Sequence, residues 1–110
     1  MKVPYCEQAI IKTEKLTKYL LNFDHPKGKS KARLFQILGF ELSNADELAA
    51  QLLNIVYDND FNETEETEHG VSYIVFGNVT GIQGRTRLFK TVWMLPLNSH
   101  IPHFVTAYPF

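Results

Sequence analysis

Residues 71–95, which read VSYIVFGNVT, GIQG and RTRLFKTVWML, decide the fold of this chain. Val71–Thr80 and Arg85–Leu95 are rich in the β-branched and aromatic residues that favour strands. Gly81–Gly84 separates these two runs with a glycine at each end, which predicts a turn. The stretch therefore predicts an antiparallel hairpin, and His103–Tyr108 is expected to add a last strand after a short connection.

The part of the chain before the hairpin has helical periodicity. Thr13 can cap a first helix, and Ser30 is a natural N-cap for a second helix that Gly39 should end. A third helix is expected from Ser43 or Asn44, with acidic residues in its first turn. The expected core positions recur at helical spacing. They are Leu16, Tyr19 and Leu20 in the first helix, Leu34, Phe35, Ile37 and Leu38 in the second, and Leu48, Leu52, Ile55 and Val56 in the third.

The segment between the helices and the hairpin, Asp58–Gly70, is strongly acidic. It contains Asp58, Asp60, Glu63, Glu65, Glu66 and Glu68 and no lysine or arginine. We expect a solvated loop of about a dozen residues here. Such a loop could also shield a basic site or attract a partner protein.

The order of these elements predicts an α+β fold. About three N-terminal helices should pack on one face of a small antiparallel β-meander, in a single domain that spans residues 1–110. Ala9–Ile11 is expected to add a short edge strand. The chain is 45% hydrophobic and has one cysteine, Cys6, so a disulfide framework is excluded and a cytoplasmic location is expected. No apolar run approaches the roughly 18 residues of a membrane span, and Met1–Pro4 lacks the apolar core of a signal peptide.

Strand parity sorts the side chains of the last two strands into two faces. The set expected to pack on the helices is Leu88, Val92, Met94, Val105 and Ala107. The opposite, open face would then display Arg87, Thr91, Trp93, Thr106 and Tyr108. Cations, hydroxyls and aromatic rings on one sheet face suit RNA binding. The alternative is that Phe89 and Trp93 belong to a small second core.

Residues 25–33, HPKGKSKAR, place one imidazole beside four cations and no acid. Gly28 loosens the backbone, and Ser30 stands at an expected helix start, where free N–H groups can bind an anion. A P-loop is not favoured, because its first glycine would fall at Phe23 and a helix rather than a strand precedes the segment. The segment therefore suits one phosphate, with a solvated basic loop as the alternative.

Metal-independent RNA cleavage requires a base for the 2′-hydroxyl, an acid for the leaving 5′-oxygen and cations around the phosphorus. The candidate catalytic residues are His25, Lys29, Arg33, Thr106 and Tyr108. The candidate phosphate- or RNA-binding residues are Lys27, Gly28, Ser30, Lys31, Arg87, Thr91 and Trp93. No cofactor is expected, and a metal site is not expected because His100 and His103 lack further ligands.

Several segments resemble a family of small bacterial domains of unknown function, many of them cyanobacterial. The segments extend over nearly the whole chain and are Lys15-Leu16, Tyr19-Leu20-Leu21-Asn22, His25-Pro26-x-Gly28-x-x-Lys31-Ala32-Arg33, Gly39, Thr91-x-Trp93 and Val105-Thr106-Ala107-Tyr108. The resemblance implies a member of a toxin–antitoxin-type gene pair or a toxin module of a larger protein. The order of elements is also similar to the barnase–EndoU–colicin–RelE ribonuclease superfamily. That similarity implies a site with a histidine (His25), a cation (Lys29 or Arg33) and a late-strand hydroxyl (Thr106 or Tyr108).

The leading hypothesis is a metal-independent endoribonuclease toxin that cleaves tRNA or mRNA and is held in check by a cognate antitoxin, with a homodimer as one option. Tyr108 or a lysine would be the second acid/base group beside His25. The competing hypothesis is a non-catalytic interaction domain: an antitoxin, an immunity protein or an RNA-binding accessory protein. Its acidic loop would then bind a basic toxin. A metal-dependent hydrolase is not favoured, because the basic face lacks carboxylates.

Overall fold

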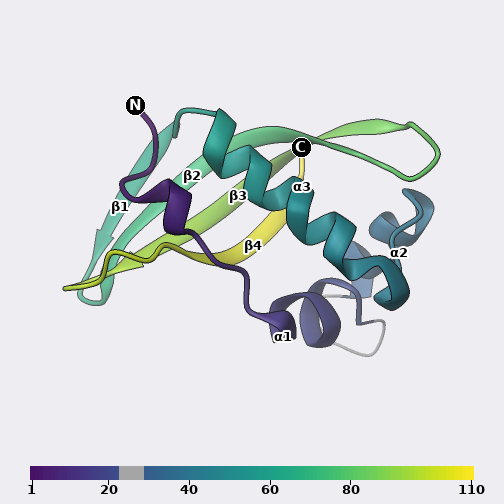
Figure 1. Cartoon of the computed structure of the whole chain (residues 1–110), viewed down its shortest axis with the longest axis horizontal. Helices are drawn as coiled ribbons and strands as arrows, with labels where there is room; N and C mark the ends of the chain where they lie inside the picture. The colour runs from purple at the N-terminus through teal and green to yellow at the C-terminus, as the bar shows by residue number, and fades with distance from the viewer. Residues whose placement is uncertain (23–28) are drawn as a thin grey trace.

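The described residues form a four-stranded antiparallel sheet, with the helices before it in the chain (Figure 1). The computed structural model describes residues 1–22 and 29–110, with the backbone alone at Lys29. The helical elements are η1 (Cys6–Gln8), α1 (Thr13–Lys15), the π-helical turn η2 (Leu16–Leu20), α2 (Lys29–Ile37), η3 (Leu42–Asn44) and α3 (Ala45–Asp58). The strands are β1 (Glu63–Thr67), β2 (Gly70–Thr80), β3 (Thr86–Pro96) and β4 (His103–Pro109), in this order across the sheet. The α+β class and the antiparallel meander are confirmed.

The predicted hairpin forms the centre of the sheet. β2 and β3 pair along their full lengths of 11 residues each. The turn between them is closed by the Gly81 N–H, which donates to the Arg85 carbonyl at 2.6 Å. Gly84 in this turn has a φ of +87°, a conformation that glycine adopts without strain. The hairpin and its turn are therefore confirmed.

The acidic segment Asp58–Gly70 contains a strand, so the expectation of a loop throughout is wrong. β1 pairs antiparallel with the start of β2, from Glu63 opposite Ile74 to Thr67 opposite Gly70. All five residues of β1 are exposed. Because the strand has no buried face, it lacks the alternation of apolar and polar residues by which a strand is predicted.

The helix starts differ from the prediction, whereas one helix end agrees with it. Thr13 is the first residue of α1, and Lys12 precedes it without a side-chain cap. Ser30 lies inside α2, which already begins at Lys29. Gly39 follows α2 with a φ of +93°, as expected for a C-terminal stop.

The longest helix, α3, provides much of the core. It begins after Asn44, as predicted, and its buried residues include all four expected core positions, Leu48, Leu52, Ile55 and Val56. α3 crosses the sheet diagonally in Figure 1 and contacts β2. A Cβ atom on Gly77 would lie 2.7 Å from both γ carbons of Ile55, so the glycine permits this close approach.

The helix α2 contributes a second part of the core. The Phe35 ring stacks on the Phe89 ring of β3, with 5.2 Å between centroids. Leu38 is buried as predicted, but Ile37 is 62% exposed and does not belong to the core. The expected strand at Ala9–Ile11 is reduced to one parallel bridge between Ile10 and His103. The packing of all three helices on one face stays a prediction.

The two faces of β3 are the reverse of the prediction. Phe89, Thr91 and Trp93 are fully buried. The expected core positions Leu88, Val92 and Met94 are exposed or half-buried. In the interior, the Thr91 hydroxyl donates to the Val75 carbonyl at 2.6 Å and accepts from the Trp93 indole N–H at 2.9 Å. Since apolar residues stand on both faces of β3, and each face also has a polar side chain, Lys90 outside and Thr91 inside, alternation alone is a weak guide, and the larger rings are buried in the core.

The pairing of β4 with β3 contains an irregularity. Thr106 lies opposite Val92, but Phe104 lies opposite Trp93, so Val105 is an extra residue between the two pairs. One extra residue reverses the alternation of faces in β4. The residues after Val105 therefore face the opposite way from where the pairing of Phe104 with Trp93 would place them in a regular strand.

Thr106 and Tyr108 consequently lie on the sheet face that β3 leaves outside. Thr106 is opposite Val92, and Tyr108 is opposite Lys90. Paired residues point to the same face of a sheet, so these side chains lie on the face opposite the buried Trp93. We call this the outer face. The parity predicted for Thr106 and Tyr108 is therefore confirmed, although that predicted for β3 is wrong.

Gly77→Ala is expected to lower the free energy of unfolding by about 1–3 kcal/mol, because the added methyl group would overlap the Ile55 side chain. Urea unfolding measures the loss. In the double variant with Ile55→Ala, the loss should be smaller than the sum of the two single losses. Strict additivity would show that the two positions do not meet.

Thr91→Val is expected to cost about 1–3 kcal/mol in urea unfolding, because the buried Trp93 indole N–H would lose its acceptor. Thr91→Ser retains the hydroxyl and is the matched control. The indole N–H resonance of Trp93 should move upfield in the valine variant and stay near its original position in the serine variant. An unchanged resonance in both variants would contradict the hydrogen bond.

Candidate functional site

Lys31 of α2 binds two hydroxyl groups that are distant in the sequence. Its Nζ donates to the Tyr19 hydroxyl at 2.5 Å and to Thr106 Oγ1 at 2.9 Å. The two hydroxyls are themselves 3.0 Å apart, so the three polar atoms form a closed triangle. The same Nζ lies 4.1 Å from the centroid of the Tyr108 ring. We call Tyr19, Lys31, Thr106 and Tyr108 the Lys31 cluster.

Three elements position the Lys31 cluster. Tyr19 comes from the π-helical turn η2, Lys31 from the start of α2, and Thr106 and Tyr108 from the edge strand β4. Thr106 is 6% exposed, whereas Tyr108 is 44% exposed. The cluster therefore has a buried floor and an open side at which a ligand can approach.

The cluster carries positive charge. The ion pairs found among residues 1–22 and 29–110 join Met1 to Asp60 and His69 to Glu68, so neither involves the cluster. Lys15 adds a second ammonium group, 5.7 Å from the centroid of the Tyr19 ring. An anion bound here would complement the Lys31 charge and accept a hydrogen bond from the hydroxyl whose proton is not already donated to the other hydroxyl.

The pKa of the Tyr19 hydroxyl is lowered below its ordinary value. Burial raises this pKa, but the hydrogen bonds with Lys31 and Thr106 and the positive charges of Lys31 and Lys15 together outweigh the burial. The O–H bond of Tyr19 is therefore more acidic than that of an ordinary tyrosine, which suits a proton-transfer group.

The structure brings together three of the residues singled out in the sequence: Lys31, Thr106 and Tyr108. Thr91 and Trp93, expected on the RNA-binding face, are fully buried and hydrogen-bonded to each other, so their side chains cannot reach a ligand. That assignment was wrong because it followed from the reversed parity of β3.

The remaining candidates from the sequence either make no described contact with the Lys31 cluster or fall outside the described residues. Ser30 and Arg33 are exposed on α2, and Arg87 is exposed near the turn end of β3, opposite Val79. No described contact links these three to the Lys31 cluster. His25, Lys27, Gly28 and the side chain of Lys29 lie outside the described residues.

Tyr19 is the residue that the sequence analysis missed as a functional group. Its helical spacing with Leu16 and Leu20 predicts a core position, and both of those leucines are buried. A signal was nevertheless present, since Tyr19, Lys31, Thr106 and Tyr108 all fall within segments that carry the family resemblance.

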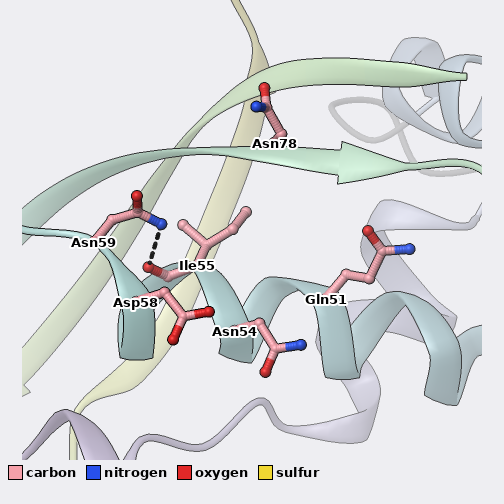
Figure 2. Close-up of a pocket in the computed structure, with 6 residues that line it drawn as sticks. All are labelled: Gln51, Asn54, Ile55, Asp58, Asn59 and Asn78. Atoms are coloured by element: carbon pink, nitrogen blue, oxygen red, sulfur yellow. Dashed lines mark hydrogen bonds between the residues drawn. The ribbon is translucent and has the colours of Figure 1, made fainter.

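A hollow lies beside α3, and none of its lining residues belongs to the Lys31 cluster. It measures about 190 Å³ and is lined by Gln51, Asn54, Ile55, Asp58, Asn59 and Asn78. Figure 2 shows the polar side chains of α3 along one wall and Asn78 of the sheet across from them. The side-chain amide of Gln51 is hydrogen-bonded to the backbone of Thr80. Its oxygen accepts from the Thr80 N–H at 2.7 Å, and its NH₂ group donates to the Thr80 carbonyl. The lining has an acid and no cation, so this hollow does not suit a phosphate.

A family model for a domain of unknown function (DUF6883) matches residues 2–110. The chain belongs to this family. Its fold is similar to that of a chain in a contact-dependent growth inhibition toxin–immunity protein complex from Klebsiella pneumoniae 342, with a TM-score of 0.73 and 14% sequence identity. The similarity covers 97% of each chain and at this identity shows the fold. No curated protein sequence matches the chain.

The described part of this DUF6883 domain contains no candidate membrane span and no candidate metal centre. None of its helices is both long and apolar enough to cross a membrane. Within residues 1–22 and 29–110, no group of three or more His, Cys, Asp and Glu side chains could hold a metal ion.

An ultraviolet titration should detect the lowered pKa of Tyr19. The difference between the native protein and Tyr19→Phe should show a phenol that ionises below the ordinary tyrosine value of about 10, and Lys31→Met should raise its pKa. In the unfolded chain Tyr19 has the ordinary pKa of about 10 and stays protonated below that pH. Between the lowered native pKa and a pH of about 10 the unfolded chain therefore binds more protons than the native protein, and the free energy of unfolding should increase as the pH rises. Ionisation of Tyr19 at or above this ordinary value would contradict the lowered pKa.

Proposed function

We propose that this DUF6883 domain is a metal-independent endoribonuclease toxin of a bacterial toxin–antitoxin-type pair, with the Lys31 cluster at its active site. The observation that carries the proposal is the contact of one ammonium group with two hydroxyls at the edge strand β4. Lysine and hydroxyl donors around one point are the groups that bind a phosphate and stabilise its developing negative charge.

The chemistry assigns a role to each group. The 2′-oxygen of a ribose loses its proton to a base and attacks the adjacent phosphorus, while the bond from phosphorus to the 5′-oxygen breaks and that oxygen gains a proton from an acid. Lys31 and Thr106 donate hydrogen bonds to the non-bridging oxygens. Tyr19, whose pKa is lowered, serves as one proton-transfer group, and His25 is the other. The products are a 2′,3′-cyclic phosphate and a 5′-hydroxyl.

The comparisons support a toxin or immunity-type role in general terms. The family carries no known function, and the structural neighbour belongs to a complex that contains a toxin and an immunity protein. Our proposal therefore adds a cognate antitoxin as the protein partner, a cytoplasmic site of action, and tRNA or mRNA as the substrate. A homodimer also stays a prediction.

A non-catalytic, immunity-type domain is the second candidate. It is favoured by β1, an edge strand whose five residues are all exposed and include Glu63, Glu65 and Glu66. An edge strand offers unpaired backbone groups to another chain, and its acids would attract a basic toxin.

The variant Lys31→Met tests the proposed enzyme. It keeps the length and apolar stem of the side chain but removes the charge, so RNA cleavage in the presence of EDTA should fall by about a hundredfold or more. Growth arrest on expression should disappear with it. Lys18→Met, an exposed lysine one residue before Tyr19, is the matched control and should keep both activities. Tyr19→Phe and His25→Ala should each lower the cleavage rate.

Two observations on the native protein would together contradict the ribonuclease proposal. If the purified native protein leaves total RNA intact with and without added metal, and its expression does not slow growth, the domain is not a ribonuclease toxin. Protection of cells from a co-expressed toxin would then support the immunity-type candidate.

A further inference from the structure

The outer face of the sheet carries a row of aromatic and cationic side chains that leads to the Lys31 cluster. Phe76 of β2 lies opposite Lys90 of β3, and Lys90 lies opposite Tyr108 of β4. These three residues, which we call the outer row, therefore point to the same face. With two strand spacings, the row extends about 10 Å across the sheet. At the β4 end it meets Lys31, whose Nζ stands over the Tyr108 ring.

Phe110 adds a second exposed ring to the outer row. Its backbone N–H donates to the Leu88 carbonyl at 3.0 Å, which continues the pairing of β3 with the last strand. Its ring meets the Phe76 ring edge to face, with 4.9 Å between centroids and an interplanar angle of 75°. Phe110 is nevertheless 73% exposed. The ring is thus held by neighbours on one side and is open to a ligand on the other.

The charges at the β4 end of the outer row favour an anion. β2, β3 and β4 contain no aspartate or glutamate, because the last acid in the sequence is Glu68, and the glutamates that share this face, Glu63 and Glu65, lie on β1 beyond the Phe76 end of the row. Lys90 lies in the outer row and Lys31 at its end, so cations and aromatic rings alternate across the sheet. Proteins bind unpaired nucleic acid with such surfaces: the bases stack on aromatic rings, and the cations contact the phosphates.

We infer that an unpaired RNA strand lies across the outer row, with a base stacked on Phe110 and Lys90 at a phosphate next to the one held by Lys31. This inference rests on the proposed ribonuclease function and specifies its substrate class. Bases in a duplex have their faces covered by neighbouring base pairs, so they cannot stack on Phe110. The enzyme should therefore act on single strands and loops and spare double-stranded RNA.

Binding of a 2′-O-methyl RNA oligonucleotide tests the inference, because this probe lacks the attacking hydroxyl and is not cleaved. By fluorescence anisotropy, Phe110→Ala should weaken the binding of the single strand by roughly tenfold. Lys90→Ala should weaken it as well and reduce the salt dependence by about one phosphate contact. Ile37→Ala, an exposed apolar residue on α2, is the matched control and should bind like the native protein. The same sequence as a duplex should bind weakly and show no effect of Phe110→Ala.

The outcomes separate this inference from the proposed function. If Lys31→Met abolishes cleavage while Phe110→Ala and Lys90→Ala leave the affinity for the single strand unchanged, the ribonuclease stands and the inference is wrong. If the native protein cleaves no RNA but binds the single strand through Phe110, the proposed ribonuclease function is wrong and the inferred RNA-binding surface is supported. If the two variants change only the affinity for the cognate antitoxin, the outer face is a protein-docking surface and the inference is overturned.

Discussion

The burial of the Trp93 side of β3 is the constraint on which the rest of the structure depends. Trp93, Phe89 and Thr91 are fully buried, and the Thr91 hydroxyl satisfies the indole N–H of Trp93 while it binds the neighbouring strand. A buried indole needs such an acceptor, because an unpaired donor in the interior is costly. Because this face is buried, Lys90 and its neighbours on the other face of β3 are half-buried or exposed.

The candidate site follows from this choice of face together with the bulge in β4. The extra residue Val105 separates two registers, and beyond it Thr106 and Tyr108 share the outer face with Lys90. Lys31 of α2 then joins them at the free side of the edge strand. The site is thus composed of one cation from α2, the Tyr19 hydroxyl from η2 and two groups from β4.

The sequence predicts the elements of this fold better than it predicts their orientation. The hairpin and the core positions of α3 are confirmed because turn glycines and helical periodicity are local signals. The orientation of β3 was predicted wrongly, since apolar residues stand on both of its faces and the prediction left out Lys90, the charge that marks the outer face. β1 was missed because a strand exposed on both faces shows no alternation. Lys31, Thr106 and Tyr108 were named as candidates from residue type, but Tyr19 was not, because its spacing with buried leucines has the same pattern as a core residue.

The triangle of Tyr19, Lys31 and Thr106 has a consequence for the order of events during synthesis. Tyr19 and Thr106 are 87 residues apart, so the contact closes a loop that includes most of the chain. Ribosomes deliver Thr106 long after Tyr19 and Lys31, and β4 has to dock on β3 before the three groups can meet. A nascent or truncated chain therefore has no complete site. The Lys31 cluster therefore cannot form until β4 has been synthesised and has paired with β3.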